Sequence, residues 1–463
     1  MPGLIQVPSS ALKLMSITNT MTDLTQAESS KSDDLLARRM KIVANGVGVF
    51  NASTVDHAQG ATIVDLDGRE WIDLAGGIGV VNAGHCPAPV VKAIQEQAAK
   101  FLHTSFNMAT YEPYIALCER LAALLPHGED TKAMLVTTGA EAVENAIKIA
   151  RQATKRQAVL CYTGAFHGRT MMSMTLTSKV DYKLNCGPFA PEVYRLPFPN
   201  FYRYREDMDE SSFVEHELKR LRESERNLVS AENLAAVIIE VVQGEGGFNV
   251  APNGYLQGLR QFCDEHGVVL IFDEVQSGFG RTGKWGAYEH FGVTPDLSTW
   301  AKSLGSGMPI GAVLGRAHIM DAAAPGTIGG TYIGNPVACA AALATLDYME
   351  EIDINRLGDH VGNIVRTRFE AMRAKYACIG DVRGLGAMIA MEFVHNKDPR
   401  NPDKETCGRL VAACSERGVI LISAGTHKNV IRVLSPLVIE DELLNRALTI
   451  MDEELARIVE GKL

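Results

Sequence analysis

Residues 268–276 read VVLIFDEVQ, five large apolar residues followed at once by two acids, a valine and a glutamine. An apolar run of this kind predicts a strand that is buried on both faces, as in a parallel sheet covered by helices. In such sheets ligands bind beyond the carboxyl ends of the strands. Asp273, which ends this strand, therefore has two interpretations. It is a helix cap or loop ion pair, the commoner role of an isolated Asp, or a carboxylate aimed at a ligand cation.

The same pattern recurs upstream of this strand. Apolar strands are predicted at 133–137, 158–162 and 235–242, and helical patterns over about 141–153 and 256–266 alternate with them. Strands that alternate with helices predict a parallel sheet with helices on both faces. We expect the residues that follow each strand to gather with Asp273 at one edge of this sheet. These residues are TGA at 138–140, TGAFH at 163–167 and QGE at 243–245.

The segments on either side of this core predict a second, smaller domain. A hairpin is expected over 63–74, followed by a flexible glycine-rich stretch at 76–79. Long helical patterns bracket the short apolar runs 388–393 (MIAMEF) and 430–434 (VIRVL), which is typical of an α+β domain. The expected organisation is a mobile N-terminal tail over 1–33, an N-terminal segment of the small domain over 34–87, a large domain over 88–350 and a C-terminal small domain over 351–463.

The composition excludes several classes of protein. Acidic residues number 55 and basic residues 45, and the formal charge of −10 argues against a nucleic-acid or anionic membrane surface. No apolar run approaches the ~20 residues that a membrane helix needs. The nine cysteines are scattered and form no C-x-x-C pair, which predicts free thiols in a reducing compartment, and hence a cytoplasmic protein.

Lys302 favours the ligand interpretation of Asp273. It lies in DLSTWAKSLGSG at 296–307, where an apolar strand precedes it and small residues follow. An isolated lysine is usually a solvated charge. A lysine that ends a neighbouring strand of the same sheet would instead lie at the mouth of the strand-end crevice.

These residues belong to motifs that resemble the class III aminotransferases, and among them the 4-aminobutyrate (GABA) aminotransferases. The resemblance runs from about Arg38 to the C-terminus. It implies the pyridoxal 5'-phosphate (PLP) dependent fold type I: a large domain with a mostly parallel seven-stranded sheet flanked by helices, and a smaller α+β domain built from both termini. The motifs, in chain order, are TTGAEAVENA (137–146), GAFHGRT (164–170), EVVQGEGG (240–247), IFDEVQ (271–276), GFGRTG (278–283), DLSTWAKSLGSG (296–307) and GGTY (329–332).

The resemblance implies PLP as the cofactor and gives two residues catalytic roles. Lys302 would bond the cofactor and carry a proton, and Asp273 would keep its pyridine nitrogen protonated. Gly139 and Ala140, at a helix start, would bind its phosphate, although many relatives carry Ser where Ala140 stands. The other implied cofactor-binding residues are Phe166, His167, Val275, Gln276 and, from a neighbouring subunit, Thr331. A homodimer, or a dimer of dimers, is therefore expected.

Substrate selection, as the resemblance implies it, depends on Ile78 and three charged residues. Arg169 would bind the distal carboxylate of the substrate and Arg432 the α-carboxylate of glutamate or 2-oxoglutarate, because a guanidinium holds a carboxylate with two hydrogen bonds. Glu245 would pair with Arg432 whenever that carboxylate is absent. The implied reaction moves the amino group of GABA to 2-oxoglutarate, giving succinate semialdehyde and glutamate by a ping-pong mechanism.

Other functions stay open at this point. A 5-aminovalerate aminotransferase is a close alternative, since one methylene is worth only about 1–3 kcal/mol of discrimination. The three charged residues disfavour a racemase or epimerase of the same fold, and Lys302 together with Asp273 disfavours a non-catalytic binding module. Residues 278–284 fit G-x-x-x-x-G-K, but Trp285 follows where a nucleotide-binding loop needs Ser or Thr. Cys263 and His266 have no further ligand nearby in the sequence, so no metal is expected.

Overall fold

The structure, a computed structural model, describes residues 30–128 and 130–462. The chain divides into two units, and the boundary along the sequence lies between Gly48 and Val49. The first unit contains helix α1 (Lys31–Ile42), which Ser30 caps by accepting a hydrogen bond from the N–H of Asp33. The predicted tail over 1–33 lies mostly outside the described residues. Its last three residues form the first turn of α1, because Ser30 and the acids of that turn satisfy the helix N-terminus.

The large domain is built on a seven-stranded sheet in the order β4-β10-β9-β8-β7-β5-β6. β10 runs antiparallel to both of its neighbours, and the pairs from β6 to β9 are parallel. The predicted mostly parallel sheet is thus confirmed. The strands are β4 (Thr131–Val136), β5 (Ala158–Tyr162), β6 (Val193–Leu196), β7 (Leu234–Ile239), β8 (Val269–Asp273), β9 (Leu297–Trp300) and β10 (Gly311–Arg316).

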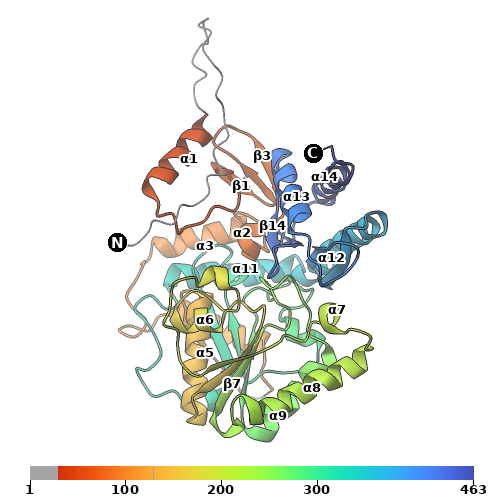
Figure 1. Cartoon of the computed structure of the whole chain (residues 1–463). Helices are drawn as coiled ribbons and strands as arrows, with labels where there is room; N and C mark the ends of the chain where they lie inside the picture. The colour runs from red at the N-terminus through yellow and green to blue at the C-terminus, as the bar shows by residue number, and fades with distance from the viewer. Residues whose placement is uncertain (1–29, 129, 463) are drawn as a thin grey trace, which may run out of the picture. The chain divides into compact units, whose positions relative to one another are not determined.

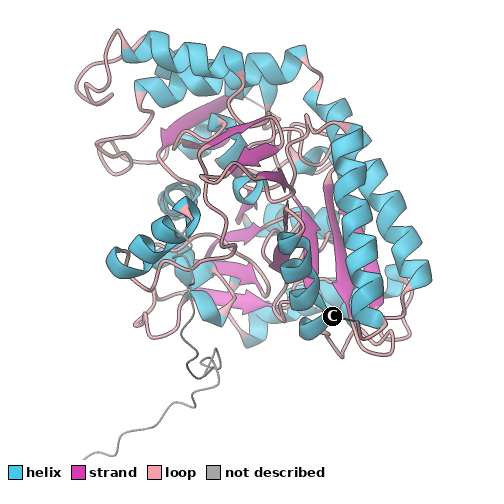
Figure 2. Cartoon of the chain, turned by 90° about the horizontal axis from the view of Figure 1, so that it is seen from above, coloured by secondary structure: helices cyan, strands magenta, loops and turns pink. Residues whose placement is uncertain are grey.

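Helices enclose these strands (Figures 1 and 2). Helix α5 packs on β7 to β10, α4 on β4 and α9 on β8. Strands β5, β7 and β8 are buried along their whole length, as their apolar runs predict. The helices of this domain are α3 (Ala88–Ala98), α4 (Glu112–Leu124), α5 (Gly139–Thr154), α6 (Met171–Leu176), α7 (Phe201–Tyr204), α8 (Glu210–Asn227), α9 (Asn253–His266), α10 (Ala317–Met320) and α11 (Pro336–Glu351), with 3-10 turns η1 (Val180–Tyr182), η2 (Ala231–Asn233), η3 (Ala287–His290) and η4 (Lys302–Gly305).

The small domain combines strands from both ends of the chain, as predicted. One sheet has the order β1-β2-β3-β13, and its C-terminal strand β13 lies parallel to β3 of the predicted hairpin. The other sheet, β11-β12-β15-β14, is antiparallel. The elements are β1 (His57–Gln59), β2 (Thr62–Val64), β3 (Glu70–Asp73), α2 (Gly76–Gly79), α12 (Ile354–Lys375), β11 (Ile379–Leu385), β12 (Met388–Phe393), α13 (Lys404–Glu416), β13 (Val419–Ile420), β14 (Ile422–Ala424), β15 (Val430–Val433) and α14 (Asp441–Val459).

The glycine-rich stretch 76–79 is a tight turn rather than the flexible segment that we expected. Gly76 is buried, has φ +54°, and a Cβ placed on it would lie 2.1 Å from the carbonyl oxygen of Leu434. The glycines therefore allow the turn to pack against the chain that leaves β15. This packing brings Ile78, the third residue of the turn, to the end of β15.

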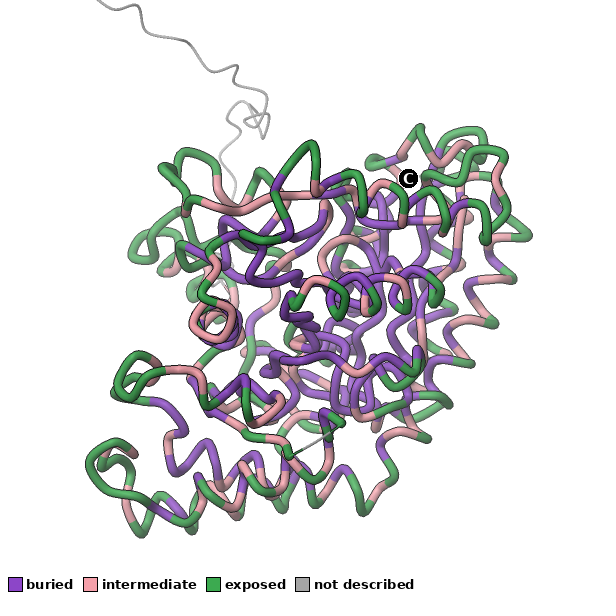
Figure 3. Tube along the Cα trace, turned by 90° about the horizontal axis from the view of Figure 1, so that it is seen from below, coloured by how far each residue is buried: buried purple, intermediate pink, exposed green. Residues whose placement is uncertain are grey.

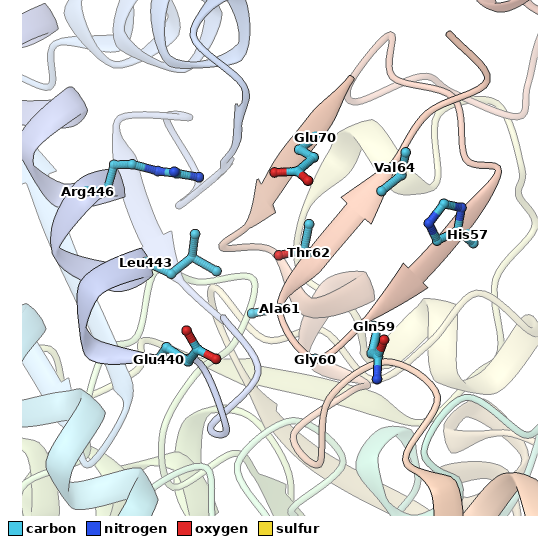
Figure 4. A pocket seen from close by; sticks show the side chains of 10 residues that line it. All are labelled: His57, Gln59, Gly60, Ala61, Thr62, Val64, Glu70, Glu440, Leu443 and Arg446. Atoms are coloured by element: carbon cyan, nitrogen blue, oxygen red, sulfur yellow. The ribbon is translucent and has the colours of Figure 1, made fainter. Parts of the chain in front are cut away.

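Buried residues gather in the middle of the unit that begins at Val49 (Figure 3). A surface groove of about 580 Å³ lies in the small domain, between the hairpin strands and α14 (Figure 4). His57, Glu70, Glu440 and Arg446 line it, and none of the predicted site residues does. Within 30–128 and 130–462, no helix combines the length and the apolar character that a membrane span requires.

Candidate active site

Asp273 is held by three donors at the carboxyl end of β8. Its Oδ2 accepts from His167 Nδ1 at 2.7 Å, and its Oδ1 accepts from Thr299 Oγ1 and from the Val275 N–H, both at 3.1 Å. The side chain is 4% exposed. Because Nδ1 faces the carboxylate, it carries the imidazole proton, and His167 Nε2 is buried with no hydrogen-bond partner among the described residues. The carboxylate is thus fixed in place, and it is not a helix cap.

Glu240 joins the two loops beside Asp273, a role that our reading of the sequence missed. Its carboxylate accepts the N–H of Phe166, after β5, and the N–H of Gly244, after β7, each at 3.0 Å. Burial raises the pKa of Glu240 to about 7, and the Asp273 carboxylate acts in the same direction against His167 and the two N–H donors. Its position within EVVQGEGG was the available signal, since an acid that interrupts an apolar strand needs a partner.

Lys302 begins the turn η4 directly after β9, with φ 46°. This backbone conformation is uncommon for a residue with a side chain and occurs where surrounding structure imposes it. The next residue, Ser303, donates to the carbonyl of Gly79 at 3.2 Å, which ties the lysine segment to the glycine turn. Burial lowers the pKa of Lys302 to about 8, and Arg432 lowers it further, against the opposing effect of Glu245 and Asp273.

Helix α5 begins at Gly139, beside the segment that follows β8. Thr138 caps it by accepting from the Glu141 N–H at 3.1 Å. The N–H groups of Gly139 and Ala140 precede the first intrahelical bond and can bind an anion. A Cβ on Gly139 would lie 2.9 Å from Val275, so glycine is what allows the helix start to approach this side chain.

Arg432 is buried on β15 and forms an ion pair with Glu245 from the large domain. The distance between Arg432 Nη2 and Glu245 Oε1 is 2.6 Å, and Nη1 donates to Gln276 Oε1 at 3.2 Å. Although burial raises the pKa of the Glu245 carboxyl, Arg432, Lys302 and a hydrogen bond from Tyr182 outweigh it and leave this pKa lowered. Glu245 is therefore a carboxylate near neutral pH. The pair is largely enclosed, since 3% of the Arg432 side chain and 14% of the Glu245 side chain are exposed.

Arg169 is exposed and rests on two aromatic rings. Its guanidinium carbon lies 4.5 Å from the centroid of Tyr182 and 5.9 Å from that of Phe166. The two rings meet edge to face at 5.2 Å. Tyr182 was not anticipated, because it lies in a segment without a motif, and only the fold brings it to the loops after β5 and β7.

Two predicted residues differ from the rest in position. Ile78 is exposed and has φ 69°, strained for a β-branched residue, in the turn that contacts Leu434 and Ser303. Thr331 lies in an exposed stretch next to Tyr332 and makes none of the contacts described above. The structure thus brings the predicted residues other than Ile78 and Thr331 together from the strand ends and β15. Ile78 and Thr331 are both exposed.

Comparison with known proteins gives one consistent result. Residues 42–455 match the family described as aminotransferase class-III. The chain belongs to this family. It is 45% identical to a probable 4-aminobutyrate aminotransferase of Bacillus subtilis (90% of this chain, 96% of the relative) and 46% identical to a 5-aminovalerate aminotransferase of Pseudomonas putida (93% and 100%).

A solved structure agrees with the family assignment. An amine transaminase from an uncultivated Pseudomonas species, in its PLP-bound form, superposes with a TM-score of 0.83 at 30% identity, over 96% of this chain and 99% of that chain. This chain is therefore an aminotransferase with the expected fold. Neither relative is a racemase or epimerase, so that alternative has no support.

Residues 278–284 have a structural role in this aminotransferase. Arg281, in the middle of the segment, is fully buried and donates to the carbonyl of Ser435 at 2.8 Å. The segment therefore fastens the large domain to the chain after β15 and is not a phosphate-binding loop. His266 pairs with Glu225 at 3.0 Å on the surface of the large domain, and Cys263 is buried in the core.

The lowered pKa of Lys302 is directly measurable. With any bound cofactor removed, competitive acetylation followed by peptide mass spectrometry should give Lys302 an apparent pKa of about 8. Only the neutral amine reacts, so its labelling should rise steeply around that pH. The exposed Lys92 is the control, because its ammonium group is not buried. A Lys302 profile that coincides with that of Lys92 would show that burial does not lower the pKa of this amine.

Proposed function

We propose that this aminotransferase takes its amino group from an ω-amino acid, GABA or 5-aminovalerate, and gives it to 2-oxoglutarate. The observation that carries the proposal is the buried Glu245–Arg432 ion pair near Lys302, with the exposed Arg169 close by. A site for α-amino acids alone needs an arginine for the α-carboxylate. It has no need of an acid that neutralises this arginine when the substrate lacks that carboxylate.

The residues present fit PLP. The start of α5 offers N–H groups for a phosphate, and Asp273 is a fixed, buried carboxylate that can face a cationic ring nitrogen. His167 donates to Asp273 and orients it. Val275 and Phe166 would contact the ring, and Gln276 its hydroxyl group. When bound, PLP supplies an electron sink for the electrons that remain when a proton leaves the substrate carbon.

Lys302 performs the proton transfer in this proposal. Its lowered pKa makes the neutral amine accessible near pH 8, so it can act as a nucleophile toward the cofactor and as a base toward the substrate carbon. Asp273 would hold the ring proton, and its three hydrogen-bond donors keep the carboxylate in place for that role. Glu240 keeps the loops of Phe166 and Gly244 at a fixed separation around it.

In this proposal Arg169 and Arg432 bind different carboxylates of the substrates. GABA and glutamate each carry a carboxylate distal to the reacting carbon, which Arg169 binds. Glutamate and 2-oxoglutarate also carry an α-carboxylate, which Arg432 binds after Glu245 moves away. With GABA the arginine keeps its Glu245 partner, because an unpaired buried charge is costly. Ile78 would form an apolar wall for the methylene chain.

5-Aminovalerate is the second candidate donor. It differs from GABA by one methylene, and the 46% identical Pseudomonas putida relative bears its name. It would use the same two arginines, because its amino-bearing carbon also lacks a carboxylate. The ratio of kcat/KM for the two donors on the purified enzyme decides between them.

The two half-reactions should separate the two arginines. Arg432→Ala should cripple the reaction with 2-oxoglutarate, by about 2–4 kcal/mol for a lost charged contact, while largely sparing the reaction with the ω-amino acid. Arg169→Ala should impair both, since both substrates place a carboxylate there. Each half is followed by the absorbance of the enzyme in single turnovers.

Glu245→Gln provides the complementary control. It removes the charge that neutralises Arg432 and should harm the ω-amino acid half more than the 2-oxoglutarate half. Equal slowing of both halves by Arg432→Ala would reduce the Glu245–Arg432 pair to a structural ion pair and leave Arg169 as the only support for the donor.

We also propose that the active enzyme is a homodimer whose partner subunit supplies Thr331 to the phosphate. Thr331 is exposed beside Tyr332, and the apolar side chains of Leu102, Met108 and Tyr332 are all more than 60% exposed. The side chain of Asn335 donates to the carbonyl of Leu102 at 3.0 Å, which joins these two segments into one surface. An exposed apolar surface of this kind is typical of an interface.

Sedimentation velocity should therefore give a dimer or a dimer of dimers. Thr331→Ala should weaken PLP binding severalfold at an unchanged sedimentation coefficient, because it removes one hydroxyl donor from the phosphate and leaves the interface in place. Met108→Glu should shift the enzyme toward an inactive monomer, since it places a charge in the apolar interface. A fully active monomer would contradict this proposal.

A further inference from the structure

Tyr182 contacts Arg169, which we propose binds the distal carboxylate, and Glu245, which pairs with Arg432. Its hydroxyl donates to Glu245 Oε2 at 3.1 Å, the carboxylate oxygen that does not face Arg432 Nη2. Its ring lies 4.5 Å below the guanidinium of Arg169. Tyr182 ends the turn η1, in the chain between α6 and β6, and no motif includes it.

The surroundings of Tyr182 keep its hydroxyl protonated and its ring in place. Burial, and then the Glu245 carboxylate, raise the pKa of Tyr182 to about 12, so the hydroxyl is a donor at any physiological pH. The Lys179 ammonium lies 5.3 Å from the same ring, and the edge of Phe166 packs against it. Two cations thus share one aromatic ring, whose electron-rich face attracts both.

We propose that Tyr182 is a positioning residue that sets the balance between the two substrate classes of the site. Its hydroxyl holds Glu245 on Arg432, and its ring supports Arg169. This inference rests on the proposed function, since it concerns the movement of Glu245. Arg432 alone fixes one oxygen of the Glu245 carboxylate, and Tyr182 fixes the other, so both contacts oppose the arrival of an α-carboxylate.

The consequence is an opposite effect on the two substrate classes. Without the hydroxyl, the paired state of Glu245 and Arg432 loses one charge-assisted hydrogen bond. Substrates without an α-carboxylate, which need that state, should bind less well. Substrates with an α-carboxylate, which must displace Glu245, should bind better. A side chain that only packs in the core would change both classes in the same direction.

Tyr182→Phe removes the hydroxyl and keeps the ring under Arg169. We expect KM for the ω-amino acid to rise roughly fivefold to tenfold and KM for 2-oxoglutarate to fall by a factor of about two or more, with kcat of both half-reactions nearly unchanged. Tyr182→Leu removes the ring as well. It should raise KM for both substrates, because Arg169 then loses its support.

Tyr194→Phe is a matched control. The hydroxyl of Tyr194, on β6, also donates to a carboxylate at 3.1 Å, that of Glu192 just before the strand, and neither residue belongs to the site. This variant should leave both KM values unchanged. The same comparison is made on binding alone, by titration calorimetry of the holoenzyme with glutarate, which carries two carboxylates, and with butyrate, which carries one. Tyr182→Phe should tighten glutarate and weaken butyrate.

The outcomes are distinct. A parallel change of both substrates or both ligands in Tyr182→Phe, or no change in either, overturns the role of the hydroxyl. If the wild-type enzyme uses neither GABA nor 5-aminovalerate, the proposed function is wrong. The calorimetric comparison of glutarate with butyrate still tests Tyr182, because it depends only on Glu245 leaving Arg432.

Discussion

The buried ion pair between Glu245 and Arg432 is the interaction on which the arrangement of the site depends. Arg432 is 2% exposed, and an unpaired charge at such a position would cost several kcal/mol. Its partner comes from the other domain, on the loop after β7. The Gly425 N–H also donates to the carbonyl of Glu245 at 3.0 Å, so backbone and side chain both attach this loop to the small domain. The pair therefore positions the side chains that recognise carboxylates and links the large domain to the small domain.

Close backbone approach is the second constraint. Gly244 precedes Glu245, and a Cβ there would lie 2.3 Å from Gln276 Oε1. The glycine turn at 76–79 approaches the chain after β15 in the same manner, and Ser303 fastens it beside Lys302. These contacts leave no space for larger residues. They explain why glycines are frequent in the motifs that also carry the charged residues of the site.

A small number of charged groups, together with burial, determines the pKa values of Lys302 and Glu240. Lys302 lies among Glu245, Arg432, Asp273 and Glu240, and burial makes its neutral form accessible. Asp273 receives three hydrogen bonds, whereas Glu240 is pushed toward protonation by burial and by Asp273. Burial therefore acts on the pKa of Glu240 more strongly than its two N–H donors do.

Much of this fold could be predicted from the sequence, because its signals are local. The VVLIF run predicted β8, and strand-end residues such as Asp273 and Glu245 gathered where parallel strands require. Three features could not be predicted. Tyr182 reaches the site through a segment without periodicity. Glu240 could be noticed in the sequence as an acid at the end of an apolar strand, but its N–H partners in two separate loops could not. The conformation of 76–79 depends on the distant Leu434, since glycine permits flexibility and close approach alike.

The most direct test of the account is a complete turnover. Purified enzyme loaded with PLP is incubated with GABA, with 2-oxoglutarate, and with both, and glutamate and succinate semialdehyde are quantified by mass spectrometry. The account predicts both products in equal amounts, over many turnovers, when both substrates are present. GABA alone should give at most one succinate semialdehyde per site, and 2-oxoglutarate alone should give no glutamate. Glutamate formation that does not depend on GABA or 5-aminovalerate, or no transfer from either donor, would contradict it.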